Sequence, residues 1–235
     1  MKKVLFFTMF ICFICINVFG QEKITENDIT VLEFPADTMM KSYLTTLVDQ
    51  QFAGRDTLLS MLKTRSGWEN RAGAIRDSMR SWTGPFPEKT PLNAITTGRL
   101  EKEGYTIEKV LFESRPDYFV SANLYVPKNI TFPRPALLNV IGHTPLGKAD
   151  ERYQSISISQ VRNGFVVLTV DCLGQGERIE SDYASWSGAP GNAHQIIGIQ
   201  TFLSGMHVFN YMVWDAVRAI DYLVSRSEVD PENIC

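Results

Sequence analysis

The sequence contains few of the residues that would hold a small fold together covalently or through a metal. Only four cysteines occur among 235 residues, and two of them, Cys12 and Cys15, lie in an apolar N-terminal run. The remaining two make no disulfide framework. The three histidines (His143, His194 and His207) have no close spacing with cysteine, which argues against a zinc site. The fold must therefore rest on a hydrophobic core.

Runs of positive charge are also absent. The chain carries 23 Lys and Arg against 26 Asp and Glu, a formal net charge of −3, and no segment is rich in lysine and arginine. A mildly acidic chain of this kind gives no reason to expect nucleic acid or an anionic membrane as a partner. No internal repeat or low-complexity tract occurs, which indicates an ordinary globular domain. The oligomeric state stays open.

Two catalytic signatures are missing or incomplete. After Gly174 and Gly176 the third position of a dinucleotide fingerprint is occupied by Ile179, so we expect no nicotinamide or flavin and no other cofactor. The G-x-S-x-G elbow of serine hydrolases has no complete match. Cys172 is a conceivable thiol nucleophile, although no residue is marked as its base.

The first twenty residues are typical of a secretory signal peptide. Lys2 and Lys3 precede an apolar run from Val4 to Val18, and Gly20 stands at the expected cleavage position. A membrane-spanning helix needs roughly twenty apolar residues, so an uncleaved anchor is the weaker alternative. We expect cleavage after Gly20, no membrane attachment afterwards, and a secreted or periplasmic location.

The next part of the chain is expected to be helical. Residues 21–36 are a polar leader, and residues 37–82 carry apolar side chains at three- and four-residue spacings. The segment GPFPEKTPLN, residues 84–93, contains three prolines and predicts an extended linker. We therefore divide the mature chain into a leader, helical segment and linker over 21–95 and a second domain over 96–235.

That second domain has the pattern of an α/β sheet. Segments 105–114 and 118–127 alternate and are joined by a turn at Pro116 and Asp117, which predicts an antiparallel pair. After them come a buried strand, a helix, a second buried strand, a second helix and a strand stub, over 135–142, 150–163, 165–170, 208–225 and 233–235. This order predicts a doubly wound parallel sheet behind two antiparallel strands.

The loop after the first buried strand, IGHTPLGK, is the first candidate for a binding site. It lies at the carboxyl edge, where open α/β sheets bind ligands. Gly142 allows the backbone to approach a substrate, and His143 and Thr144 follow it. The alternative is that Gly142 only turns the chain and His143 is an exposed loop residue.

The loop after the second buried strand, DCLGQGER, is the second candidate. Asp171, Gly174 and Gly176 belong either to a pocket or to a tight strand-to-loop turn, and the turn is favoured. A third segment, SWSGAPGNAH (185–194), is expected to be a loop in which Trp186 and His194 line a pocket or face solvent. His207 precedes a helix and is expected to be packed rather than catalytic.

Five blocks now stand in a recognisable order: GPFPEKTPLN, ESRPDYFVSANLYVP, IGHTPLGK, DCLGQGER and YMVWDAVRAIDYLVSRSEVDPENI. From about residue 55 to its end the chain resembles secreted α/β-hydrolases of the acetyl xylan esterase-like group. A looser similarity links it to the catalytic domains of prolyl oligopeptidase-type peptidases. The resemblance implies that residues 96–235 are the N-terminal, incomplete part of an α/β-hydrolase fold.

The resemblance also implies a division of the catalytic machinery. In this family the triad order is Ser, then Asp or Glu, then His, after a VDPENI-like strand, so all three are expected beyond Cys235. The chain would supply the backbone N–H of His143 as one oxyanion-hole donor. One departure is that Thr144, Pro145 and Leu146 precede Gly147, where the family commonly has an earlier second glycine. The 235-residue chain by itself is then expected to be inactive.

Three functions remain open from the sequence. The first is the N-terminal part of a secreted serine esterase acting on acetylated polysaccharide or another ester. The second is a peptidase of the same fold. The third applies if the chain truly ends at Cys235: a non-catalytic remnant or carbohydrate-binding module. Trp186 and Trp214 would then be candidate sugar platforms, although for Trp214, on an apolar helix, a place in the core is favoured.

Overall fold

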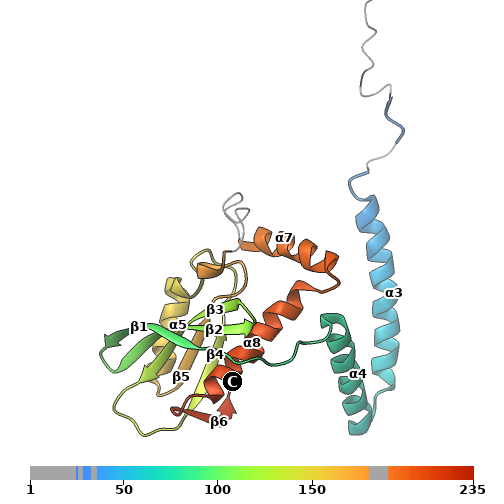
Figure 1. Cartoon of the computed structure of the whole chain (residues 1–235). Helices are drawn as coiled ribbons and strands as arrows, with labels where there is room; N and C mark the ends of the chain where they lie inside the picture. The colour runs from blue at the N-terminus through green and yellow to red at the C-terminus, as the bar shows by residue number, and fades with distance from the viewer. Residues whose placement is uncertain (1–24, 26–28, 33–35, 180–189) are drawn as a thin grey trace, which may run out of the picture. The chain divides into compact units, whose positions relative to one another are not determined.

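The structure is a computed structural model that describes residues 25, 29–32, 36–179 and 190–235, without the side chains of residues 190–192. The chain divides after Glu69 into two units, and the second, Asn70–Cys235, contains the sheet (Figure 1). The predicted signal peptide lies outside the described residues. Within the described ranges, no helix has both the length and the apolar character needed to cross a membrane.

The helical segment expected over 37–82 is confirmed as two helices. They are α3 (Met39–Met61) and α4 (Arg65–Thr83), and neither contains a buried residue. The apolar positions that gave α3 its helical pattern, such as Leu44 and Leu47, are exposed to solvent. The three- and four-residue spacing therefore predicted the secondary structure correctly, although it does not mark a buried face.

A mixed six-stranded sheet forms the second unit, in the order β1-β2-β3-β5-β4-β6. The first three strands and β5 pair antiparallel, whereas β4 pairs parallel with both β5 and β6. The bounds are β1 Ile95–Lys102, β2 Tyr105–Arg115, β3 Tyr118–Pro127, β4 Arg134–Val140, β5 Val166–Val170 and β6 Val229–Ile234. The expected antiparallel strands, the parallel strands and the strand at the end of the chain are all present.

One strand is not predicted by the sequence pattern. β1 lies at the edge of the sheet, and only Gly98 among its residues is even half-buried. A strand that is exposed on both faces has no reason to alternate apolar and polar residues, so its sequence, ITTGRLEK, carries little periodic signal. Three antiparallel strands, rather than two, therefore precede the parallel part.

The two faces of the sheet are covered by different helices (Figure 1). On one face Val161 of α5 (Glu151–Arg162) packs with Ile107 of β2. On the other face Leu223 of α8 (Val208–Val224) packs with Phe112 of the same strand. Fully burying one such side chain contributes about 1.5–3 kcal/mol. The doubly wound arrangement predicted from the strand–helix order is confirmed.

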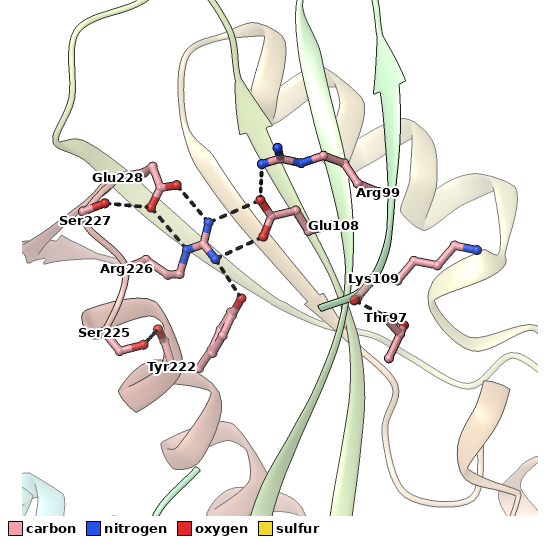
Figure 2. Close-up of polar contacts among 9 residues, drawn as sticks. All are labelled: Thr97, Arg99, Glu108, Lys109, Tyr222, Ser225, Arg226, Ser227 and Glu228. Carbon is pink, nitrogen blue, oxygen red and sulfur yellow. Dashed lines mark hydrogen bonds and ion pairs between the residues drawn. The ribbon is translucent and has the colours of Figure 1, made fainter. Parts of the chain in front are cut away.

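A polar cluster joins the antiparallel strands to the end of α8, as Figure 2 shows. The carboxylate of Glu108 on β2 is ion-paired with Arg99 of β1 and with Arg226, whose Nη1 lies 3.0 Å from Glu108 Oε2. Arg226 also pairs with Glu228 at 2.8 Å. Because Arg226 and Glu228 directly precede β6, this cluster lies at the amino edge of the parallel strands.

Candidate functional site

Two loops meet at the carboxyl edge of the parallel strands. One follows β4 and contains the 3₁₀ turn η1 (Gly147–Ala149), and the other follows β5 and contains η2 (Gly176–Arg178). The amide of Gly176 donates to the carbonyl of Pro145 at 3.3 Å, which joins the loops directly. The two segments picked out in the sequence, IGHTPLGK and DCLGQGER, therefore form one surface.

Asp171 is the centre of the contact between these loops. Its side chain is fully buried and accepts hydrogen bonds from the backbone amides of Lys148 at 2.7 Å and Glu177 at 3.3 Å. Ser121 of β3 donates to the same carboxylate at 2.7 Å, and the ammonium of Lys148 pairs with it. A carboxylate bonded in this way holds the backbone of both loops in place.

Glycine is required at two positions around that carboxylate. Gly147 and Gly176 have φ of +57° and +59°, a left-handed conformation that L side chains rarely adopt. A Cβ on Gly176 would lie 2.6 Å from Asp171 Cγ, and a Cβ on Gly147 would lie 2.6 Å from Gly176 Cα. The two glycines therefore let the loops close around Asp171.

Three consecutive amides after β4 are used differently. The N–H of Gly142 donates to the Tyr153 hydroxyl of α5 at 2.8 Å, and the N–H of Thr144 donates to Gln175 Oε1 at 2.7 Å. Between them, the N–H of His143 has no acceptor among the described residues. The loop is thus pinned on both sides of one open donor at the edge where α/β sheets bind ligands.

The imidazoles of His143 and His194 are brought together by the fold. His143 Nε2 lies 2.9 Å from His194 Nδ1, and His194 Nε2 lies 2.5 Å from the carbonyl oxygen of Leu173. The segment 185–194 was expected to be a loop, but its end belongs to helix α7 (Pro190–Leu203). Proline is favoured at the first helical position, which accounts for a helix starting at Pro190.

The other aromatic and histidine candidates lie elsewhere. Trp186 falls outside the described residues. Trp214 is buried on α8, where its indole N–H donates to Ser114 O at 2.7 Å and its ring stacks on Phe86, so it offers no platform to a sugar. His207 was expected to be packed, but it is exposed and caps α8 by accepting from Phe209 N–H at 3.1 Å.

Burial determines the protonation of the Cys172 thiol. Its thiol is buried and contacts Ile141 O at 3.3 Å. Burial raises the pKa of Cys172 to about 11, so the sulfur is protonated at neutral pH and unsuited to act as a nucleophile. Among the described residues, no group of three or more His, Cys, Asp or Glu is placed to hold a metal ion.

A separate cavity of about 600 Å³ lies between the two loops and strands β2 and β3. Phe119 and Asn123 of β3 and Leu146 and Glu177 of the loops contribute to its lining. The segment 142–144 does not line it. The open amide of His143 therefore lies outside the lining of this cavity.

Four supporting residues were not singled out from the sequence, namely Ser121, Lys148, Tyr153 and Gln175. Lys148 and Gln175 stand inside the quoted motifs, next to glycines, and a polar side chain beside a tight turn was the available signal. Ser121 and Tyr153 lie on a strand and a helix whose patterns indicate only secondary structure. Nothing in their spacing indicates which loop they would reach.

A family model described as acetyl xylan esterase (AXE1) matches residues 92–235, more than half of the chain. The chain belongs to the acetyl xylan esterase (AXE1) family. The matched residues include all six strands of the sheet and both loops of the carboxyl edge. The family consists of carboxylic ester hydrolases of the α/β-hydrolase fold, as the resemblance had indicated.

Individual proteins are similar to this chain in sequence or in fold. The "Putative hydrolase YtaP" of Bacillus subtilis (strain 168) is 28% identical over 168 residues, which cover 64% of this chain and 50% of that protein. A crystal structure described as a putative acetyl xylan esterase from Bacteroides fragilis NCTC 9343 superposes with a TM-score of 0.58 at 19% identity. The structure of Methylesterase BT1017 superposes with a TM-score of 0.55 at 22% identity.

This chain matches only part of the length of each relative. The Bacteroides structure is covered over 46% of its length by 72% of this chain, and Methylesterase BT1017 over 37% of its length by 76% of this chain. The chain therefore spans half or less of the length of each of these three relatives. At these identities the superpositions show the fold, which is a partial α/β-hydrolase.

Proposed function

We propose that the protein is a secreted serine esterase that removes acetyl groups from plant polysaccharide such as acetylated xylan. In this proposal the described chain supplies the part of the site that receives the acyl carbonyl. The nucleophile, its acid and its base would come from sequence after β6. Membership of a family of ester hydrolases supports the reaction class, and the apolar leader supports secretion.

The open N–H of His143 is the observation that carries the proposal. Attack on an ester carbonyl places negative charge on its oxygen, and preorganised N–H donors stabilise that charge. The amides on either side are occupied by Tyr153 and Gln175, so the donor that remains is defined by the loop itself. One such donor is worth about 3 kcal/mol of the activation barrier.

The neighbouring strand is suitably directed for the second half of the site. β6 runs parallel to β4, and Cys235 exchanges hydrogen bonds with Ala136 and Leu138, short of the carboxyl end of β4 at Val140. A turn that follows this strand within a few residues would lie beside Gly142 and His143. A serine on such a turn is the usual nucleophile of the fold.

The reaction class is tested with the purified full-length protein. We expect release of acetate from acetylated xylan and from an aryl acetate. If neither ester is turned over, the proposal is wrong. Release of peptides would instead support the peptidase alternative, and retention on insoluble xylan without turnover would support a carbohydrate-binding module.

The donor is tested with two substitutions at one position. His143→Pro removes the backbone N–H, whereas His143→Ala keeps it, so only the first abolishes the proposed donor. We expect His143→Pro to lower kcat by about 100-fold or more, with a smaller loss for His143→Ala. Circular dichroism and the melting temperature check that both variants fold. Equal losses in the two variants would contradict a role for the amide.

A further inference from the structure

The pair formed by His143 and His194 connects three segments that are distant in sequence. His143 lies in the loop after β4, His194 lies in the first turns of α7, and Leu173 lies in the loop after β5. The two rings meet edge to face, with centroids 4.8 Å apart and planes at 60°. The chain of contacts therefore runs from the Leu173 carbonyl through His194 to the residue that carries the open amide.

The Leu173 carbonyl assigns the tautomers of both rings. A carbonyl oxygen only accepts hydrogen bonds, so His194 Nε2 must carry the proton in that contact. In a neutral imidazole the other nitrogen then accepts, and His194 Nδ1 receives a hydrogen bond from His143 Nε2–H. His143 is left with Nδ1 as an acceptor. With both rings neutral, the two contacts therefore define one direction of hydrogen bonding, from His143 through His194 to the Leu173 carbonyl.

His194 is itself firmly placed. Gly174 has φ of +77°, and a Cβ there would lie 3.1 Å from Ala193 Cβ and 3.4 Å from His194 Cδ2. The absence of a side chain at Gly174 lets the start of α7 lie directly on the loop after β5. Gly174 therefore serves the docking of α7 as well as the turn.

The two held amides leave the peptide plane between them without a hydrogen bond of its own. Tyr153 accepts from the amide of Gly142 and Gln175 accepts from the amide of Thr144, and neither bond involves the plane between Gly142 and His143. Glycine at one end of that plane resists a rotation of the plane least. Fixing the His143 side chain restrains the Cα–Cβ direction, and with it the direction of the His143 N–H.

We infer that His194 is a positioning residue that aims the His143 N–H at the acyl carbonyl by holding the His143 imidazole. The inference rests on the proposed function, in which that N–H is an oxyanion donor. His194 does not touch the reacting atoms in this account. Misdirected groups in an active site lower the rate of the chemical step more than they lower substrate binding.

Steady-state kinetics of the full-length enzyme on an aryl acetate test this role. We expect His194→Ala to lower kcat about tenfold with little change in KM, because ground-state contacts are untouched. His194→Asn places an amide oxygen near the former Nδ1 and should recover much of the loss. The double variant with His143→Ala should be no slower than the slower single variant, since both remove one contact.

The controls separate this role from general destabilisation. His207→Ala removes the histidine that caps α8, outside the pair, and should leave kcat unchanged. ¹⁵N shifts of the imidazoles in the wild-type enzyme should show His194 protonated at Nε2 and unprotonated at Nδ1. The opposite tautomer would contradict the proposed direction of the hydrogen bonds.

The outcomes distinguish the inference from the proposal beneath it. A wild-type enzyme that turns over no ester would overturn the proposed function and this inference with it. An active wild type whose His194→Ala variant keeps full kcat would overturn the inference alone. Loss in His194→Ala without recovery in His194→Asn, or additive losses in the double variant, would also contradict positioning through the imidazole contact.

Discussion

Asp171 and Glu108 are both buried carboxylates of the same sheet, but they are held by different kinds of partner. Asp171, at the carboxyl edge, receives two backbone amides, a hydroxyl and the buried ammonium of Lys148. Glu108, near the amino edge, is paired with the side chains of two arginines (Figure 2). The side chain of Arg99 is 55% exposed and that of Arg226 is 21% exposed.

The two kinds of partner differ in how firmly each carboxylate can hold the backbone around it. A carboxylate bonded to backbone amides fixes the path of the loops, because each amide has one direction. A carboxylate bonded to long cationic side chains links secondary elements but leaves the backbone free to adjust. The carboxyl edge therefore has the rigidity needed to present a single open donor, whereas the amino-edge cluster fastens β1 and β2 to the segment before β6.

Removing the Asp171 carboxylate should lower the stability of the protein more than any other change considered below. Asp171→Ala leaves the Lys148 ammonium buried with only the exposed Glu177 as a partner, and it strips two loop amides of their acceptor. We expect the free energy of unfolding to fall by about 3–5 kcal/mol. Urea unfolding of the full-length protein measures this change. Asp56→Ala, at an exposed ion pair of α3, is the control and should change stability by less than about 0.5 kcal/mol.

Gly176→Ala should cause the second-largest loss of stability. The new Cβ meets the Asp171 carboxylate and forces an alanine to adopt a left-handed backbone, at a cost of about 2 kcal/mol or more. Gly104 is the matched control, because it has φ of +81° and a Cβ added there would meet nothing within 4 Å. Gly104→Ala should therefore cost only about 1 kcal/mol. Equal losses at the two glycines would show that the loops do not close on Asp171.

The two arginines that pair with Glu108 should contribute unequally to the free energy of unfolding. Arg226→Ala removes hydrogen bonds to Glu108 and Glu228 and should cost about 2 kcal/mol, whereas Arg99→Ala should cost less than about 1 kcal/mol. Thermal unfolding of the two single variants and the double variant of the full-length protein measures both costs and the coupling between the two arginines. A cost for Arg99→Ala as large as that for Asp171→Ala would remove the contrast between the two edges.

The smallest effect concerns Asp150, a third carboxylate, which caps α5 and accepts from the Thr144 hydroxyl at 2.6 Å. Hydrogen bonds from Thr144 and then from Arg152 lower the pKa of Asp150 to about 2. Because the folded pKa lies below the ordinary value of 3.8, its stabilising effect is present above about pH 4 and is lost as the pH falls toward 2. Thr144→Val should raise this pKa, as followed by carboxyl ¹³C titration, and an unchanged pKa would contradict the contact.

Among the strands, the sequence predicted those that are buried on at least one face. β2 and β3 alternate because one set of side chains packs under α8 and the other under α5, so their patterns followed directly from burial. β1 was missed because it is exposed, and the start of α7 was missed because small residues around Pro190 resemble a loop. Neither segment therefore carries a periodic apolar pattern that would predict its secondary structure.

The site was predictable only in outline. Glycines after two buried strands placed both loops at the carboxyl edge, and the family resemblance singled out His143. The contact between His143 and His194 joins residues 51 positions apart, and the acceptors Tyr153 and Gln175 lie 11 and 31 residues from the amides they hold. Such contacts depend on how helices dock on the sheet, which no local spacing encodes.

The most direct measurement is a structure of the full-length enzyme inhibited by an alkyl phosphonate, which reacts with a serine nucleophile and mimics the tetrahedral intermediate. The account predicts a phosphonyl oxygen about 2.7–3.1 Å from His143 N, with Gly142 N–H still on Tyr153 and Thr144 N–H still on Gln175. A phosphonyl oxygen out of hydrogen-bond reach of His143 N, or one bound instead by Gly142 or Thr144, would contradict it.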